Sequence, residues 1–133
     1  MTYMGRPYYP WWLNNLDDDV TGQGAFMEGL AQGAEAVRAI VTYARTVYEN
    51  QEFSFVGDYG SGGYIEEYTA DVQGHPTSVV VTVARNAEGK ANQIVVNHRP
   101  RSSVLLVARL CGENFAGTPL AKLFISGTSS QSA

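Results

Sequence analysis

The sequence predicts an α+β domain in which a curved antiparallel sheet wraps around N-terminal helices and is followed by a short C-terminal helix. Three observations lead to this fold class. The 133 residues are 44% hydrophobic and 17% charged with a single cysteine, which suits one domain held together by its core. One segment has helical periodicity, and the segments after it alternate with a period of two. We expect the domain over residues 1–126 and a serine-rich, disordered tail over residues 127–133.

Aromatic side chains dominate the start of the chain. The N-terminal aromatic cluster consists of Tyr8, Tyr9, Trp11 and Trp12. Rings of this size are buried in most folds, so they either cover the mouth of a pocket or reach across a dimer interface. The sequence leaves both arrangements open. The polar run 14–19 is expected to form a turn of helix or a loop, and residues 20–24 are too glycine-rich to predict a strand.

Residues 34–48 form the predicted amphipathic helix. Its apolar side chains recur at spacings of three and four: Val37, Ile40, Val41, Ala44, Val47 and Tyr48. Gly33 and Asn50 suit its two ends. Arg38 and Arg45 fall on the polar side, where we expect them to face water.

The period changes to two after this helix. Strand-like runs include Phe53 with Phe55, residues 64–72, residues 77–85 and residues 92–99. The connections between them are short and contain turn-forming residues, so we expect an antiparallel meander. A sheet bent over one helix forms a cone with an apolar interior, and such interiors are common sites for small molecules.

A second helix is predicted after the last strand. Pro100 ends the strand, and Ser102 or Ser103 can cap a helix that begins at Val104. This helix is apolar on nearly every side, so we expect it to lie between the sheet and another surface.

Composition excludes several classes of function. Nine lysines and arginines stand against 13 acidic residues, and no segment concentrates positive charge, so no nucleic acid is expected as a partner. The longest near-apolar stretch, residues 78–84, is far below the roughly 18 to 20 residues of a membrane helix. The first residues do not form a secretory signal, so we expect no membrane partner and a cytoplasmic location.

No metal or cofactor is predicted. Two histidines and one cysteine lack the spacing of zinc sites, and His75 lies in an exposed turn. The acidic run Asp17 to Asp19 lacks the interleaved ligands of calcium loops, so we interpret it as structural.

Short motifs resemble the nuclear-transport-factor-2-like superfamily. They are Leu16-Asp17-Asp18-Asp19-Val20, Glu28-Gly29, the helix start Gly33-Ala34-Glu35-Ala36-Val37-Arg38, and Asn97-His98-Arg99-Pro100, which is similar to small bacterial members of the SnoaL-like group. The element order agrees over residues 11–125. The resemblance implies a cone-shaped fold that dimerises through the outer face of its sheet and has a pocket at its wide end. It implies no single activity, because members include ketosteroid isomerases, cyclases, epoxide hydrolases, dehydratases and binding proteins.

The chain departs from the family pattern at three places. The general-base aspartate of ketosteroid isomerases aligns with Gly24, or at best Gln23, and neither can remove a proton. No strand carries the Arg-x-Asp pair of the epoxide hydrolases. About 16 residues precede the acidic run, so the long first helix of the family is shortened or replaced by the N-terminal aromatic cluster.

His98 and Glu66 are the candidate catalytic residues. His98 shares strand parity with Ile94 and Val96, so it faces the cone if they do; otherwise it caps the strand end or lies at a subunit contact. Glu66 shares a face with Tyr68, and inside an apolar cone its pKa would rise enough for it to act as a base. The other interpretation places Glu66 on a solvated outer strand. The candidate ligand-binding residues are Trp12, Phe26, Tyr43, Tyr68 and Val96.

Two hypotheses of different class follow. In the first, a homodimer binds a small, mostly apolar molecule and acts as an isomerase, cyclase or dehydratase on a carbonyl compound, with His98 or Glu66 as base and a tyrosine stabilising the oxyanion. In the second, the chain is a non-catalytic binding or assembly module whose cavity is filled by its own side chains. The volume of the cavity separates them.

Overall fold

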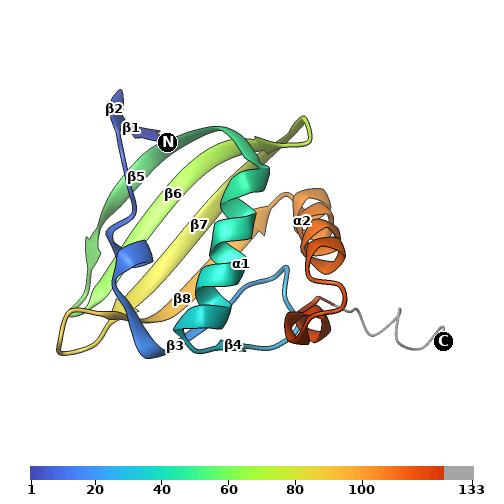
Figure 1. The fold of residues 1–133 in the computed structure, drawn as a ribbon. Helices are drawn as coiled ribbons and strands as arrows, with labels where there is room; N and C mark the ends of the chain where they lie inside the picture. Colours follow the sequence, from blue (N-terminus) through green and yellow to red (C-terminus); the bar gives the residue numbers. More distant parts are fainter. Residues whose placement is uncertain (125–133) are drawn as a thin grey trace.

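A computed structural model describes residues 1–124 and places an eight-stranded sheet around one long helix (Figure 1). The elements are β1 (Thr2–Tyr3), β2 (Arg6–Pro7), η1 (Trp11–Asn14), β3 (Leu16–Gln23), β4 (Ala31–Gln32), α1 (Ala34–Val47), β5 (Tyr48–Tyr59), β6 (Gly63–Val72), β7 (His75–Arg85), β8 (Ala91–Arg99), α2 (Arg101–Asn114) and η2 (Pro119–Leu123). The strand order in the sheet is β2-β1-β5-β6-β7-β8-β3-β4. The α+β fold class predicted from the sequence is confirmed.

The centre of the sheet is the predicted antiparallel meander of β5, β6, β7 and β8. Its register places Glu66 opposite Val81, and Val81 opposite Val96. Because side chains alternate across a strand, this register fixes which residues face the helix. On β6 the buried positions are every second residue from Tyr64 to Val72. The sheet curves around α1, which lies across its concave face (Figure 1).

The margins of the sheet differ from the predicted meander. β3 pairs parallel to β8, and β1 pairs parallel to β5, so the complete sheet is mixed. The expectation of a helical turn or loop over residues 14–19 was wrong, because β3 begins at Leu16. Residues 20–24, where glycine left only a weak indication of a strand, also belong largely to β3. Aspartate and glycine disfavour strands locally, but the pairing with β8 and the burial of Leu16, Val20 and Gly22 outweigh that preference.

Helix α1 forms as predicted and ends one residue earlier than expected. Gly33 precedes it with φ at +93°, a backbone conformation that glycine adopts without a steric penalty. Val37, Ile40 and Ala44 are buried against the sheet, so the predicted apolar stripe faces the core. Tyr48 is already extended and begins β5.

Helix α2 begins at Arg101, so the predicted start at Val104 with a serine cap was wrong. Ser103 is fully buried, and its hydroxyl lies 2.7 Å from that of Thr77 on β7. This bond fixes the first turn of α2 to the sheet. Leu105 is 58% exposed, so the helix is buried on one side and not on nearly every side. The predicted tail, residues 127–133, lies outside the described residues.

The first 15 residues form no long helix. Two short strands, β1 and β2, are joined through Met4 and Gly5, both with positive φ, and the chain then passes in front of the concave face to η1 (Figure 1). We call residues 1–15 the N-terminal segment. No helix within residues 1–124 is long and apolar enough to span a membrane.

Candidate functional site

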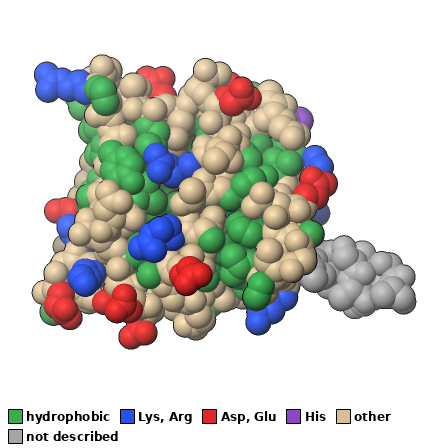
Figure 2. Space-filling model, viewed as in Figure 1, with side chains coloured by type: hydrophobic (Ala, Val, Ile, Leu, Met, Phe, Trp, Pro, Cys, Tyr) green, Lys and Arg blue, Asp and Glu red, His purple; other side chains and the backbone are tan. Residues whose placement is uncertain are grey.

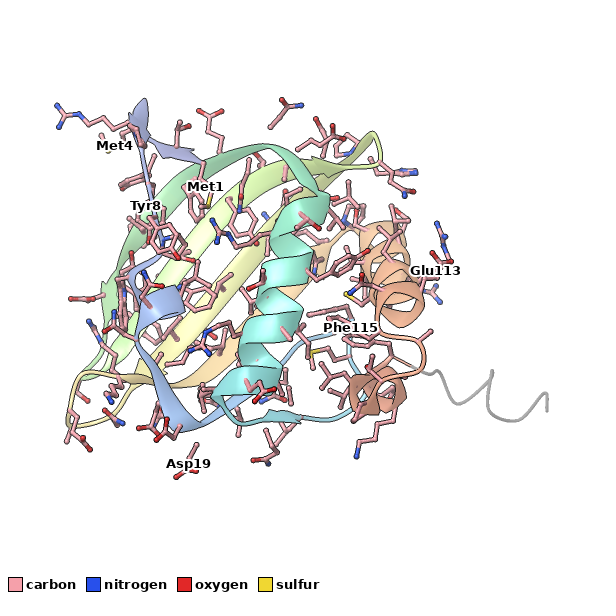
Figure 3. The ribbon with its side chains drawn as sticks, viewed as in Figure 1. Met1, Met4, Tyr8, Asp19, Glu113 and Phe115 are labelled. Carbon is pink, nitrogen blue, oxygen red and sulfur yellow. The ribbon has the colours of Figure 1, made fainter. Side chains whose placement is uncertain are left out.

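An internal cavity of about 40 Å³ lies between the N-terminal segment, α1 and the concave face of the meander. The N-terminal segment contributes Met1, Pro10, Trp12 and Leu13 to its wall. The loop after β3 contributes Phe26, and α1 contributes Val41, Ala44 and Arg45. The sheet contributes Tyr48, Gln51, Phe53, Glu66, Tyr68, Val81 and Val96. Figure 3 shows the labelled Met1 and Tyr8 on this concave side of the sheet.

Glu66 is the one carboxyl group in this wall, and its side chain is only 1% exposed. Strand alternation places it on the inner face of β6 between Tyr64 and Tyr68, which are also buried. Burial raises the pKa of Glu66 because an apolar surrounding disfavours the carboxylate, and a hydrogen bond from Tyr8 acts in the opposite direction. A carboxyl group with a raised pKa can exchange a proton closer to neutral pH than an exposed one.

Tyr8 anchors the N-terminal segment to this carboxyl group. Its hydroxyl donates to Oε2 of Glu66 at 2.5 Å. The same hydroxyl also contacts the hydroxyl of Tyr64. Because a phenol has one proton, Tyr64 donates to Tyr8 when Tyr8 donates to Glu66. Burial raises the pKa of Tyr8, and the bond that it donates to the carboxyl group of Glu66 raises it further, so the phenol stays protonated.

Trp12 is buried in the wall of the cavity. Its side chain is 3% exposed and lies close enough to Glu66 that its indole N–H acts to lower the pKa of that carboxyl group. Trp11 packs edge-on against Tyr64, and Tyr8 packs against Phe53. The N-terminal aromatic cluster therefore packs largely against the inside of the chain's own cone. Tyr9 is the exception, at 49% exposure.

His98 is 6% exposed and lies behind the wall of the cavity, not in it. Its Nε2 is 2.6 Å from the hydroxyl of Tyr48, while Nδ1 has no partner among the described residues. Phe26 packs edge-on against the imidazole ring. Burial lowers the pKa of His98 to about 4, so the ring is neutral at neutral pH. His98 is therefore linked to the cavity through its hydrogen bond with Tyr48, which lines it.

Tyr43 does not join the other predicted ligand-binding residues. It lies on the side of α1 that faces α2, where its hydroxyl donates to the carbonyl oxygen of Leu110 at 3.3 Å and its ring packs edge-on against Phe115. The four other candidates, Trp12, Phe26, Tyr68 and Val96, all line the cavity. Phe26 and Val96 also separate it from a second, smaller cavity of about 20 Å³.

Sequence reasoning missed Tyr8, Tyr48 and Arg45 as members of the site. Tyr8 and Tyr48 come from segments that the fold brings to Glu66 and His98 through long-range pairing, which no local pattern reveals. Arg45 was expected to face water, but it is half-buried and lines the cavity. The end of an amphipathic stripe is the only sequence signal that could have placed it there.

Gly24, which the sequence motifs were expected to place where ketosteroid isomerases carry their base, leaves no space for a side chain. A Cβ atom on Gly24 would lie 1.9 Å from the carbonyl oxygen of Val96, closer than two such atoms can approach. Its neighbour Gln23 lines the second cavity. The chain therefore has no acid or base at this position, and Glu66 on β6 is the carboxyl group that the cavity offers instead.

No group of three histidine, cysteine, aspartate or glutamate side chains within residues 1–124 converges to hold a metal ion. Cys111 is fully buried, and burial raises the pKa of its thiol to about 12, so it is not a reactive thiolate. The polar side chains in the cavity wall are few: Glu66, the phenols of Tyr48 and Tyr68, Gln51 and Arg45. A mostly apolar wall with a few polar groups suits a small organic ligand.

The fold of this chain is similar to the folds of several solved structures. No family model and no curated protein matches the chain. A steroid delta-isomerase from Pseudomonas aeruginosa matches with a TM-score of 0.73 over 78% of this chain and 77% of the other, at 18% identity. An NTF-2 like protein of unknown function from Burkholderia xenovorans matches with a TM-score of 0.54 over 63% and 64%, also at 18% identity.

A third match is a hypothetical protein with a ketosteroid isomerase-like fold from Catenulispora acidiphila, solved in complex with trimethylamine. Its TM-score is 0.53 over 71% of this chain and 76% of the other, at 13% identity. Identities this low relate folds and not activities. The chain therefore has the nuclear-transport-factor-2-like cone fold that its sequence motifs predicted.

Proposed function

We propose that this chain binds a small, mostly apolar molecule inside its cone. The observation that carries the proposal is Glu66, a carboxyl group 1% exposed in the wall of an aromatic-lined cavity. Burying a carboxyl group in such a place lowers stability, and perturbed groups of this kind gather at functional sites. A cone that served only as a scaffold would be more stable with an apolar side chain there. The complex of one structural neighbour with trimethylamine shows only that a protein of this fold can hold a small molecule.

The size of the cavity restricts the ligand. A volume of 40 Å³ holds a few water molecules and is well below the roughly 150 Å³ of a cavity that binds benzene. Part of the wall belongs to the N-terminal segment, so a larger molecule enters when Trp12 and Met1 move outward. The ligand is therefore a compact molecule with few polar atoms, or one that exchanges places with the N-terminal segment.

The chemistry we propose is proton transfer on a carbonyl compound. Ionised Glu66 would remove a proton from the carbon next to the carbonyl and return it to the same or a neighbouring carbon. Tyr68, whose phenol lines the cavity beside Glu66, would donate to the carbonyl oxygen as negative charge develops on it. His98 is a positioning residue in this scheme, because its bond to Tyr48 orients a phenol of the cavity wall.

Exchange of carbon-bound hydrogen for deuterium tests this proposal without knowledge of the natural substrate. Pentan-2-one in D₂O is followed by proton NMR with and without the protein. We expect the protein to accelerate the loss of the signals next to the carbonyl, and Glu66→Gln to abolish the acceleration. Glu67→Gln, one residue along on the outer face, is the matched control and should keep it. Acceleration that survives in Glu66→Gln would reject the role of Glu66.

The second candidate is the non-catalytic module, and the small volume of the cavity favours it. Here the N-terminal segment is a permanent plug, and the bonds among Tyr8, Tyr64 and Glu66 hold it in place. Pentan-2-one would then shift neither the indole N–H signal of Trp12 nor the unfolding temperature, and no hydrogen exchange would be accelerated.

We also propose that two copies pair through the outer face of the meander. Register places Ile65, Thr82 and Val95 side by side there, and all three are only half-buried in the single chain. Apolar and β-branched side chains on a sheet face suit a self-complementary interface. Sedimentation should show a dimer that Val95→Lys converts to a monomer; an unchanged mass would exclude this face. We propose the cytoplasm as the compartment, since the single cysteine cannot form a disulfide within the chain.

A further inference from the structure

A surface hollow of about 470 Å³ adjoins the internal cavity. Four residues line both: Met1, Arg45, Tyr48 and Gln51. The remaining walls of the hollow are polar and come from the last turns of α1 and the start of β5: Thr42, Thr46 and Asn50. The shared residues therefore form a neck between a polar surface hollow and the apolar interior, and a ligand that enters there passes Arg45.

Arg45 brings a positive charge to this neck, and no carboxylate among residues 1–124 pairs with it. The ion pairs within residues 1–124 are Arg85 with Asp58 and Arg109 with Glu113. The guanidinium of Arg45 instead lies 5.3 Å from the ring centre of Tyr9, and its Nη2 is 4.0 Å from the sulfur of Met1. Neither contact neutralises the charge. Figure 2 shows basic side chains set among hydrophobic ones on the face that α1 and the N-terminal segment share.

The charge of Arg45 affects the pKa of Tyr68, which lines the cavity. Burial dominates the pKa of Tyr68 and raises it well above its ordinary value, while the positive charge of Arg45 acts to lower it. Beyond the first cavity the second one is lined by apolar residues such as Val37, Ile40 and Ile94, with Gln23 at its edge. Phe26, Val41 and Val96 lie between the two cavities. The path therefore becomes more apolar from the neck inward.

We propose that the molecule bound in the cone is a small organic carboxylate, whose anionic group pairs with Arg45 at the neck and whose apolar part extends past Glu66 into the interior. This inference rests on the proposed function and names its ligand class. A guanidinium offers two parallel N–H donors that match the two oxygens of a carboxylate. A neutral apolar molecule would leave this charge half-buried and unpaired at the entrance. An organic cation would meet it as a repelling charge.

A pair of probes of equal shape tests the proposal. Pentanoate and its neutral amide, pentanamide, are titrated into the protein, and binding is followed by the indole N–H signal of Trp12 in NMR spectra. We expect pentanoate to bind about tenfold more tightly than pentanamide, since one charge-assisted hydrogen-bonded pair contributes a preference of this order. In Arg45→Gln the two dissociation constants should become equal, and Arg45→Lys should retain part of the preference.

The control is Arg38→Gln, because Arg38 is exposed on the same helix two turns before Arg45. It should leave the tenfold ratio unchanged. Comparing the two probes within each variant cancels any general change in the shape of the cavity. A ratio near one in the wild-type protein, or a ratio that Arg45→Gln leaves intact, would overturn the carboxylate proposal while binding in the cone stands. If pentanoate, pentanamide and pentan-2-one all fail to bind, the proposed function itself fails.

Discussion

The meander and the N-terminal segment are held in place by different forces. Each strand of the meander has at least nine residues, and β6 pairs along its length with β5 and β7. The N-terminal segment has only the two-residue strands β1 and β2, and aromatic contacts with one hydrogen-bonded chain through Tyr8 fix the rest. The meander therefore determines the fold, whereas a few side-chain contacts determine whether the cone is closed. A change in one region should leave the other largely intact.

The largest expected effect comes from a truncation inside the meander. Ile94 on β8 is 1% exposed and packs beneath α1, so Ile94→Ala should lower the free energy of unfolding by about 2–5 kcal/mol. Met4→Ala in the N-terminal segment removes a side chain that is 81% exposed and should stay within about 0.5 kcal/mol of the wild-type protein. Urea unfolding measures both. Equal losses would mean that the two regions unfold as one tightly coupled unit.

Helix α1 and the central strands were more predictable than the strands near the edges of the sheet, because hydrophobic periodicity in a sequence reflects local burial. The apolar stripe of α1 and the alternation along β6 and β7 each bury one face, and that burial leaves a pattern in the sequence. β3 leaves almost none. Its three aspartates and Gly22 become a strand only because β8 presents a free edge beside them, and that edge exists only in the folded sheet.

The next largest effect is a loss of stability at low pH that arises from His98 on β8 of the meander. The pKa of His98 is about 4 in the folded protein and near 6.5 in the unfolded chain. Between these values the unfolded chain binds more protons, so stability is fully present above pH 6.5 and falls as pH drops toward 4. The shift corresponds to a loss of about 3 kcal/mol. Urea unfolding between pH 4 and 7 should show it.

Two variants isolate the contribution of His98 to this pH dependence. His98→Phe should flatten the profile, while His75→Gln should leave it unchanged because His75 is exposed in the turn before β7. If the free energy of unfolding of His98→Phe still falls as the pH drops, another group causes the acid sensitivity. His98 would then not be the buried, neutral group described above.

A smaller effect should open the N-terminal segment without unfolding the meander. Tyr8→Phe keeps the ring against Phe53 but removes the hydroxyl that donates to Glu66, so we expect a loss of about 1 kcal/mol. Amide hydrogen exchange should become faster in the N-terminal segment and remain slow in β6 and β7. Tyr9→Phe is the control, because the hydroxyl of Tyr9 makes only an exposed 3.4 Å contact with Asn14. Faster exchange across the whole sheet would contradict separate stabilisation of the two regions.

The candidate site was predictable only where strand parity decides it. Strand parity showed which residues share a face with Glu66 and with His98, but it left open whether that face points into the cone, which the structure shows it does. The partners that give them their chemistry, Tyr8 and Tyr48, depend on where two distant segments cross the sheet. Tyr43 illustrates the limit, since nothing in the sequence shows that α2 covers its side of α1.

The smallest expected effect lies where the two regions meet, at Glu66. Burial raises the pKa of Glu66 above its ordinary value of 4.5, so the folded protein binds more protons than the unfolded chain as pH rises through this range. The contribution of Glu66 is therefore most favourable at or below pH 4.5 and is lost as pH rises through the folded pKa. Glu66→Gln keeps an oxygen that can accept from Tyr8 but never ionises, so at pH 7 it should stabilise the protein beyond the 0.5 kcal/mol scatter of neutral substitutions.

Glu67→Gln separates burial from charge. Glu67 is the next residue on β6 and points to the outer face, so its replacement removes the same net charge without removing a buried carboxyl group. Only Glu66→Gln should gain stability progressively as pH rises, and the pH at which the gain levels off marks the completed ionisation of Glu66. An equal gain in both variants would reflect the overall negative charge of the chain. A loss in Glu66→Gln would mean that the carboxylate, accepting from Tyr8, holds the N-terminal segment closed more strongly than its burial opposes folding.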